Sequence, residues 1–504
     1  MAQMPCCKGG GDNCTMPDCV IASTQQNWIP RDKDIKKYLH FDRTISEELL
    51  ASIANDPNLV SRHSFFPLIR FFESWIRFRH GGKRIEKKRP LRYAARIDAA
   101  IFARYRALLS DFFEAELKLK GLSSVPVAYR RLPRACGGNK SSIDIAKEVF
   151  DFIRSCDNCI VTVVDIKSYF ESLDHGRIRQ CWEALIKQPL PPDHQAVFNA
   201  ITKYSVVDYD KIMKRLELMV HPAVGSRGER RKRKIDLLKG KYYKQLCSVE
   251  DFRNLVAGGD PNFPSLIQKN GFNFGIPQGT PISDLVANFY LMDFDAEVNS
   301  WVSEHSGIYM RYSDDIIVVI PQSNSISDFE VKDFLQTRIR HYGSKLQIQD
   351  KKVSISRFSR NGLVQDFSRV FGRASANGLE YLGFQYDGAS IQIKNSTLSN
   401  AWRKMKRRAY GSACAYVKRY RSKGEIWIRA NYSSLQLETN LLRDVTYNQD
   451  TGYDTWTFLK YVRRCSRTFS NYPRNFSSQT KRYRRLTKLM IEKSLDKAIS
   501  VHLK

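Results

Sequence analysis

Acidic residues and long apolar runs are scarce in this chain of 504 residues, and no internal repeat is found in it. Asp and Glu number 52 against 82 Lys and Arg, so the formal net charge is +30 at pH 7. A surplus of this size favours attraction to phosphate backbones. No apolar run approaches the roughly 18 residues of a membrane-spanning helix, and the first residues lack the continuous apolar stretch of a secretory signal. These absences predict a soluble, cytoplasmic protein with no membrane partner.

The cysteines follow no standard zinc-binding spacing. There are 11 of them, and Cys6, Cys7, Cys14 and Cys19 crowd the N-terminus. A chain of this length needs no disulfides to build a core. We therefore interpret the cysteines as reduced thiols, with metal binding by the N-terminal four as the alternative.

The positive charge is concentrated in the last fifth of the chain. Residues 401–504 hold 24 Lys and Arg against 7 Asp and Glu. Aromatic residues are interleaved with these cations in 402–408, 416–421 and 481–485, a pattern that suits backbone contacts and stacking on bases. A second basic run, 227–244, is either an exposed loop that grips RNA or a disordered hairpin tip.

Two adjacent carboxylates are predicted at the tip of a β-hairpin. Tyr312-Ser313-Asp314-Asp315 lies between two apolar runs, and Asp165 ends a β-branched run typical of a buried strand. Burying like charges together is costly unless a cation neutralises them, and Mg²⁺ prefers oxygen ligands. Two strands that deliver these carboxylates to one point can hold two ions about 3.5–4 Å apart. For an isolated Asp-Asp pair the alternative is a solvated turn.

A glycine-flanked turn is suited to a nucleotide. Gly275 and Gly279 flank Pro277-Gln278, so the backbone there can approach a ligand closely. The Gln278 amide offers both a donor and an acceptor. A base or a ribose fits against such a turn.

At these segments the chain resembles the reverse transcriptase family, whose blocks occur here in the family's order. The matching blocks are 165–175, 275–288, 312–315, 346–352 and 380–384. The resemblance implies an α+β, helix-rich right-hand polymerase with fingers, a palm built on an antiparallel sheet and a helical thumb. The implied divisions are an N-terminal extension over 1–95; fingers and the first half of the palm over 96–290, with a basic insertion at about 212–270; the rest of the palm, with the Tyr-Ser-Asp-Asp hairpin and the primer grip, over 291–390; and a basic helical thumb with the C-terminal region over 391–504.

The resemblance also implies roles for single residues. The catalytic residues would be Asp165, Asp314 and Asp315, and two Mg²⁺ ions, with Mn²⁺ as a substitute, would be held by Asp165, Ile166 and Asp314. The nucleotide would be bound by Phe170, Gln278, Gly279, Arg130, Arg131 and Lys352, with Lys140 as a further candidate. The primer and template would contact Tyr312, Tyr381, Leu382, Gly383, Arg403, Lys404, Arg407 and Arg408.

Two of these roles have plain structural alternatives. Phe170 matches the family's aromatic ring under the incoming sugar, where it would clash with a 2′-hydroxyl and favour deoxynucleotides. Otherwise it is a core residue, as aromatic residues beside buried strands usually are. Lys352 either lies near the leaving phosphates or is a solvated surface lysine.

The implied activity is RNA-directed DNA synthesis from dNTPs by two-metal nucleotidyl transfer. Residues 28–31, 40–42, 63–67 and 145–150 resemble bacterial abortive-infection and other defence-associated reverse transcriptases. That finer resemblance implies an antiphage role in the bacterial cytoplasm, with a noncoding RNA as template or scaffold and sometimes with self-assembly.

Three alternatives stay open on the sequence. An RNA-dependent RNA polymerase would share the carboxylates but would incorporate ribonucleotides without any change at Phe170. A retron or group II intron-type reverse transcriptase would share the blocks. A noncatalytic RNA-binding scaffold would keep only the polymerase fold. Template, priming hydroxyl, product type and oligomeric state are likewise left undetermined.

Overall fold

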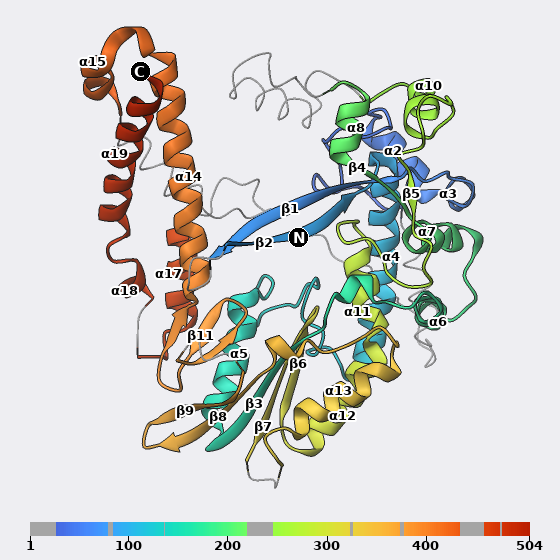
Figure 1. Ribbon diagram of the computed structural model, residues 1–504. Coiled ribbons are helices and arrows are strands. Elements are labelled where there is room, and N and C mark those ends of the chain that lie inside the picture. Colours follow the sequence, from blue (N-terminus) through green and yellow to red (C-terminus); the bar gives the residue numbers. More distant parts are fainter. Residues whose placement is uncertain are drawn as a thin grey trace, which may run out of the picture.

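The computed structural model describes residues 27–78, 84–135, 137–218, 245–322, 326–372, 377–433, 458–473 and 476–503. The four N-terminal cysteines and the basic run 227–244 lie outside these ranges. The described chain is a mixed α/β structure with antiparallel sheets (Figure 1), which confirms the coarse fold class. Its six described cysteines are free thiols, and none of its described helices has the length and apolar character needed to cross a membrane.

A five-stranded antiparallel sheet carries the three predicted catalytic carboxylates. Its order is β6-β7-β3-β8-β9, with register fixed by long ladders between neighbours. The strands are β3 (Asn158–Asp165), β6 (Ile308–Tyr312), β7 (Asp315–Pro321), β8 (Ser354–Asn361) and β9 (Val364–Phe371). The β-branched run before Asp165 therefore forms the predicted strand, and it lies at the centre of the sheet.

Both faces of this sheet are buried. Val161 and Cys159 of β3 belong to one hydrophobic cluster with α5, β10–β12 and α17, whereas Ile160 and Val164 belong to another with α11, α12 and α13. These helices are α5 (Ser142–Ser155), α11 (Ser283–Tyr290), α12 (Met292–Glu304), α13 (Glu330–His341) and α17 (Phe458–Thr468). Burial on two faces explains why β3 and β7 read as continuous apolar runs rather than as alternating ones.

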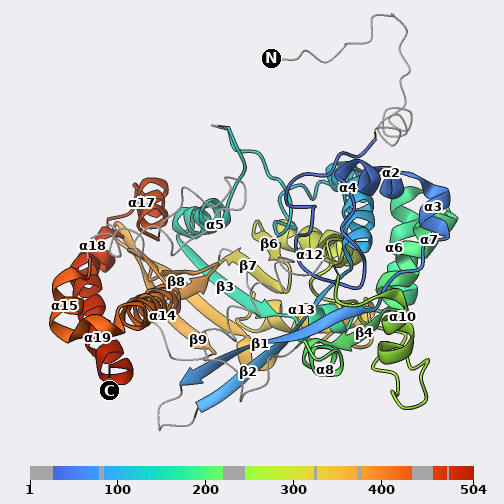
Figure 2. The same cartoon turned by 90° about the horizontal axis from the view of Figure 1, so that it is seen from above.

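The N-terminal half adds a second sheet and a long hairpin. β1 (Leu68–Phe78) and β2 (Arg84–Tyr93) pair antiparallel, β4 (Ser205–Asp208) runs parallel to β1, and β5 (Gln268–Lys269) pairs with β4. The hairpin extends toward the side on which α14 stands (Figures 1 and 2). The remaining elements of this half are α2 (Glu47–Asn55), α3 (Pro57–Ser61), α4 (Arg96–Leu119), η1 (Tyr169–Glu171), α6 (His175–Ile186), α7 (Pro192–Thr202), α8 (Tyr209–Arg215), α10 (Val249–Asp251) and η2 (Phe252–Val256).

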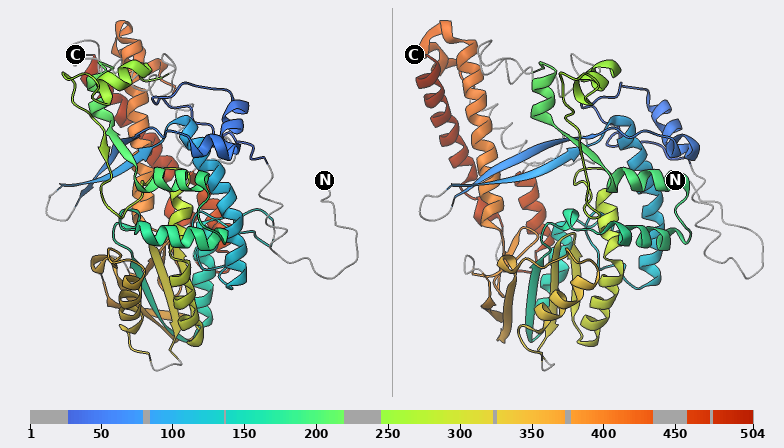
Figure 3. Two further views of the ribbon diagram at one scale, coloured as in Figure 1. Left: turned by 90° about the vertical axis from the view of Figure 1, so that its right-hand side faces the viewer. Right: turned by 45° about the vertical axis from the view of Figure 1, so that its right-hand side comes forward.

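The C-terminal part forms an upright pair of helices. α14 (Asn395–Arg419) and α19 (Tyr483–His502) lie side by side (Figures 1 and 3), with Ala413, Val417 and Leu495 in their shared core. A three-stranded sheet in the order β10-β11-β12 lies at their base. The other elements are η3 (Asp350–Lys352), β10 (Leu379–Tyr381), β11 (Phe384–Tyr386), β12 (Ile391–Ile393), η4 (Arg421–Lys423), α15 (Gly424–Asn431) and α18 (Ser477–Thr480).

Candidate active site

The fold brings the three predicted carboxylates together at one end of the five-stranded sheet. Asp165 is the last residue of β3 and is directly paired with Asp315, the first residue of β7. Ser313 turns the β6–β7 hairpin with φ +62°. The backbone N–H of Ile166 donates to the carbonyl oxygen of Asp314 at 2.9 Å, which fixes the end of β3 against the hairpin tip.

These carboxylates repel one another in a partly desolvated site. Burial raises the pKa of Asp314, and the nearby Asp165 raises it further. Burial, Asp314 and Asp165, in that order, raise the pKa of Asp315 to about 7. Lys352, on η3, opposes both shifts, and its Nζ lies 2.5 Å from Asp165 Oδ2. The site therefore draws a cation, and here a lysine ammonium is that cation.

The donor set fits Mg²⁺ or Mn²⁺. Carboxylate and carbonyl oxygens are the ligands that such hard ions prefer, and a divalent cation would relieve the repulsion that raises these pKa values. Across the described ranges, no three His, Cys, Asp or Glu side chains form a group that could hold a metal ion. That Asp165 and Asp314, with the main chain at Ile166, hold an ion therefore stays a prediction.

A second buried charge cluster lies behind the hairpin, and sequence analysis did not anticipate it. Arg311 is fully buried and donates to both carboxylate oxygens of Asp295, at 2.7 and 2.6 Å. Tyr309 also donates to Asp295, and Asn288 accepts from Arg311 through its backbone carbonyl at 3.1 Å. No sequence pattern links Arg311 with Asp295, which lie 16 residues apart on β6 and α12.

Two turns, one containing Phe170 and the other containing Gln278, lie against each other beside the carboxylate site. Ile276 donates its backbone N–H to the carbonyl of Phe170 at 2.8 Å. Gly279 has φ +117°, and a Cβ there would lie 2.3 Å from the carbonyl oxygen of Arg92. Glycine is therefore required at 279 by this close approach of β2. Phe170 is half-buried and packs on the larger core cluster. It therefore contributes to the hydrophobic core, as the structural alternative for this residue predicts.

Two residues absent from the sequence-based assignment face the carboxylates. Tyr129, with φ +62°, has its ring centroid 6.5 Å from that of Tyr312. Arg89, on β2, lies near enough to Asp314 and Tyr129 to lower the pKa of both against the larger effect of burial. No sequence motif singles out Arg89.

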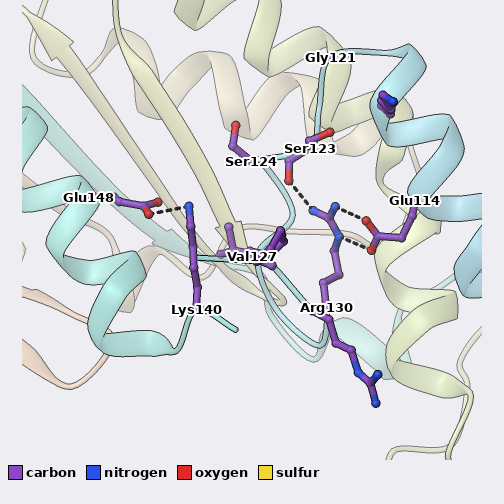
Figure 4. A pocket seen from close by; sticks show the side chains of 12 residues that line it. Glu114, Gly121, Ser123, Ser124, Val127, Arg130, Lys140 and Glu148 are labelled. Atoms are coloured by element: carbon purple, nitrogen blue, oxygen red, sulfur yellow. Dashed lines mark hydrogen bonds and ion pairs between the residues drawn. The ribbon is translucent and has the colours of Figure 1, made fainter. Parts of the chain in front are cut away.

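Arg130, by contrast, is held by the protein. Its Nε and Nη2 donate to the two carboxylate oxygens of Glu114 at 2.8 and 2.6 Å. Its Nη1 donates to the backbone carbonyls of Ser123 and Pro126. Figure 4 shows this guanidinium pointing back to α4. It organises the 121–133 loop, because all its nitrogens already have acceptors.

The other two candidate cations line the same pocket as Arg130. Lys140 forms a 2.6 Å ion pair with Glu148 on one side of a cavity of about 560 Å³ (Figure 4), and Arg131, which is exposed, also lines this cavity. Among the contacts of the described residues, none joins Arg130, Arg131 or Lys140 to the three carboxylates. The structure thus keeps this trio together but does not bring it to the carboxylates, and its nucleotide role stays a prediction.

The predicted primer-grip residues lie next to the carboxylate hairpin. Leu382 and Gly383 form the turn between β10 and β11, with φ +43° and +90°. Tyr381 is buried, and its pKa is raised by burial and then by Asp315 and Tyr312. The two hairpins are therefore neighbours.

The predicted basic contacts of α14 form an exposed helix face. Arg403, Lys404, Arg407 and Arg408 are exposed, while Met405 on the opposite face is buried with Ala401 and Ala409. This alternation leaves the charged heads in water. The helix that carries this face stands to one side of the carboxylate sheet in Figure 1.

No protein-family model and no curated protein matches the sequence. Two telomerase structures are similar at low level. Apo telomerase from Candida Tropicalis, truncated from its C-terminal domain, has 10% identity and a TM-score of 0.37, with 69% of this chain and 60% of that chain covered. Telomerase from Candida albicans in complex with a TWJ fragment of telomeric RNA has 13% identity and a TM-score of 0.34, with 93% and 63% covered. The chain thus spans less than two thirds of either telomerase chain, and scores of this size establish neither its fold nor its function.

Proposed function

We propose that the chain is an RNA-directed DNA polymerase that joins deoxynucleotides to a hydroxyl primer by two-metal nucleotidyl transfer. The observation that carries the proposal is the meeting of Asp165, Asp314 and Asp315 at the ends of paired antiparallel strands, where burial and then mutual repulsion raise the pKa of Asp314 and Asp315. Strained like charges in a site open to ligands are typical of functional carboxylates. The order of the family-like blocks along the chain supports the same reading.

In this proposal the five-stranded sheet is the palm. The β1–β2 hairpin with α4 belongs to the fingers, and α14 with α19 is the thumb. The primer grip is the β10–β11 turn, whose Tyr381 neighbours the carboxylate hairpin. The support for this layout is the position of the hairpin and the helix pair around the sheet end (Figure 1).

Asp165 and Asp314, with the main chain at Ile166, would hold the metal ions. Bound there, the ions would activate the attacking hydroxyl and stabilise the leaving pyrophosphate. The Gln278 turn would lie against the base or ribose, and the Phe170 ring under the sugar would exclude a 2′-hydroxyl. Among the described residues, Lys352 pairs with Asp165 and Arg89 lies near Asp314, so both are better placed than Arg130 to meet the triphosphate.

For biological context we propose bacterial antiphage defence with an associated noncoding RNA. The support is the resemblance of the N-terminal segments to defence-associated reverse transcriptases, together with the exposed basic face of α14. Deletion of the neighbouring DNA around the coding sequence, followed by phage challenge, tests whether an RNA from that locus is required. A retron or group II intron-type enzyme would instead show its RNA or intron in that DNA.

One observation favours a second candidate, a noncatalytic RNA-binding scaffold. Lys352 forms an ion pair with Asp165 where a metal ion would lie. In a scaffold this lysine would be the permanent counterion of the site. Asp314→Ala would then leave phage resistance intact.

The test is labelled nucleotide incorporation by the full chain purified with its native RNA. Mg²⁺ is supplied, and each dNTP and NTP is offered singly and together. Asp314→Ala is compared with Asp157→Ala, which removes an exposed carboxylate just before the opposite end of β3. Incorporation of dNTPs by wild type and Asp157→Ala, lost in Asp314→Ala, is the expected result.

Other outcomes overturn the proposal in distinct ways. Efficient NTP incorporation by wild type indicates an RNA polymerase. If wild type and Asp314→Ala are both inactive while both protect cells, the scaffold replaces the enzyme. Single-nucleotide lanes show whether the product is homopolymeric.

A further inference from the structure

Arg92, the penultimate residue of β2, contacts both turns of the nucleotide site. Its backbone N–H donates to the carbonyl oxygen of Gln278 at 3.1 Å. Its own carbonyl oxygen lies 2.3 Å from the position that a Cβ at Gly279 would take. The Gln278 turn is therefore held against the edge of β2 without room for adjustment.

The side chain of Arg92 reaches the other turn. Its Nη2 lies 3.8 Å from Oε1 of Glu171, the residue after Phe170. The guanidinium also lies over the ring of Tyr204, 5.5 Å from its centroid. Arg92 thus joins β2 and the Gln278 turn to the short η1 helix that contains Phe170.

This ion pair is incomplete. The Arg92 side chain is 8% exposed, and among the described residues neither Nε nor Nη1 has a hydrogen-bond partner. Buried donors of a charged group cost free energy when they lack an acceptor. A hydrogen-bonded pair requires about 2.7–2.9 Å, so Glu171 is about 1 Å too far away. Its carboxylate is half exposed and free to approach.

Glu171 and Phe170 are adjacent residues of the three-residue η1 helix, so an ion pair that fixes the Glu171 carboxylate also restrains the backbone at Phe170. The other side of that turn is tied to Ile276, two residues before Gln278. If a sugar lies between the Phe170 ring and the Gln278 turn, as the proposed function has it, their separation limits the space at its 2′ position. A firm Arg92–Glu171 pair keeps that room small.

We propose that Arg92 is a positioning residue for sugar selection, which holds Glu171, and with it Phe170, at a fixed distance from Gln278. The inference rests on the proposed function and extends it: discrimination against ribonucleotides depends on a residue of β2 as well as on Phe170. The pair closes when a nucleotide occupies the site, since an enclosed site strengthens charge-assisted hydrogen bonds.

The experiment measures the ratio of kcat/KM for a dNTP to that for the matching NTP on a primer–template. The variants are Arg92→Met, Glu171→Gln and both together, with Arg92→Lys as the conservative change. Methionine keeps the backbone N–H that Gln278 accepts and much of the stem volume. We expect the ratio to fall about tenfold in each single variant and no further in the double variant, because the two residues act as one unit. Arg92→Lys should retain part of the ratio.

Arg70→Met is the matched control. Arg70 lies directly across the ladder from Arg92 but pairs with Asp208 at 2.7 Å. Its loss perturbs the same hairpin without touching the Phe170 turn, so the ratio should stay at the wild-type value. Glu171→Gln, at a half-exposed position, keeps the test available if Arg92→Met does not fold.

Phe170→Ala separates failure of this inference from failure of the proposed function. If Phe170→Ala lowers the ratio while Arg92→Met and Glu171→Gln leave it unchanged, the Arg92 inference is overturned and the polymerase proposal stands. An equal fall in Arg70→Met also overturns the inference, because it indicates general loosening of the hairpin. If wild type does not incorporate nucleotides, both are overturned.

Discussion

Two buried charge clusters lie on the same β6–β7 hairpin, and they are built in opposite ways. Arg311 and Asp295 neutralise each other through two short hydrogen bonds. Three and four residues after Arg311, Asp314 and Asp315 face Asp165 with like charge. The first cluster is neutral within the protein, whereas in the second the three carboxylates outnumber the ion pair between Asp165 and Lys352.

This difference distinguishes structural from functional burial of charge. A buried ion pair with all its hydrogen bonds made is tolerated but adds little net stability. A buried group of like charges destabilises the fold and persists where a ligand uses it. Removing one charged side chain should therefore change the stability of the fold in opposite directions in the two clusters.

The largest effect is expected on activity, when a residue of the carboxylate cluster is replaced. Asp314→Asn should lower dNTP incorporation by about 10³-fold or more, because bound metal ions supply several kcal/mol of transition-state stabilisation. Its melting temperature should equal or exceed that of wild type, since a repulsive charge is removed. Incorporation kinetics measure the loss of activity, and calorimetry measures the melting temperature. A destabilised Asp314→Asn would show that this carboxylate has a structural role instead.

In the Arg311–Asp295 cluster, a substitution should change the stability of the fold. Arg311→Met leaves the Asp295 charge buried and unpaired, which should lower the free energy of unfolding by about 3–5 kcal/mol. Adding Asp295→Asn should recover part of the loss, because the orphaned charge is then removed. Urea unfolding of the three proteins measures this. Equal stability of Arg311→Met and wild type would refute the contrast between the clusters.

Metal ions should stabilise one cluster and leave the other unaffected. At about 100 times its Kd, Mg²⁺ should raise the unfolding free energy of wild type by about 2.7 kcal/mol. An Asp165→Asn, Asp314→Asn double variant should show no such gain, whereas Asp157→Ala should behave as wild type. Thermal unfolding with and without Mg²⁺ tests this. A gain that survives in the double variant would place the ion elsewhere.

The smallest single-residue effects are expected at the exposed charges of α14, because water already solvates them. Arg403→Gln and Arg407→Gln should each reduce the dependence of nucleic-acid affinity on salt by about 0.7–0.9 in log–log slope if they neutralise a phosphate. Binding isotherms at several salt concentrations measure the slope. An unchanged slope would mean that this face is merely solvated.

Local structure was largely predictable from the sequence. The run before Asp165 forms the buried strand β3, and Tyr312–Asp315 turns a hairpin. Ser141 and Asp144, which have the spacing of a capping box, form one at the start of α5. Each feature depends on residues close together in the chain, so side-chain periodicity and hydrogen-bonding capacity were sufficient to predict it.

The partners of the arginines were decided only by the tertiary structure. Arg130 resembled a phosphate-binding residue in the sequence, yet α4 places Glu114 within its reach. No sequence motif includes Arg92, yet the fold brings Gln278 and Glu171 to it from far along the sequence. An arginine has the same donors and charge wherever it occurs. Which acceptor it meets depends on distances of a few ångströms between segments many residues apart. The sequence alone therefore determined the carboxylates and their strands, and the packing of those strands decided which cations serve them.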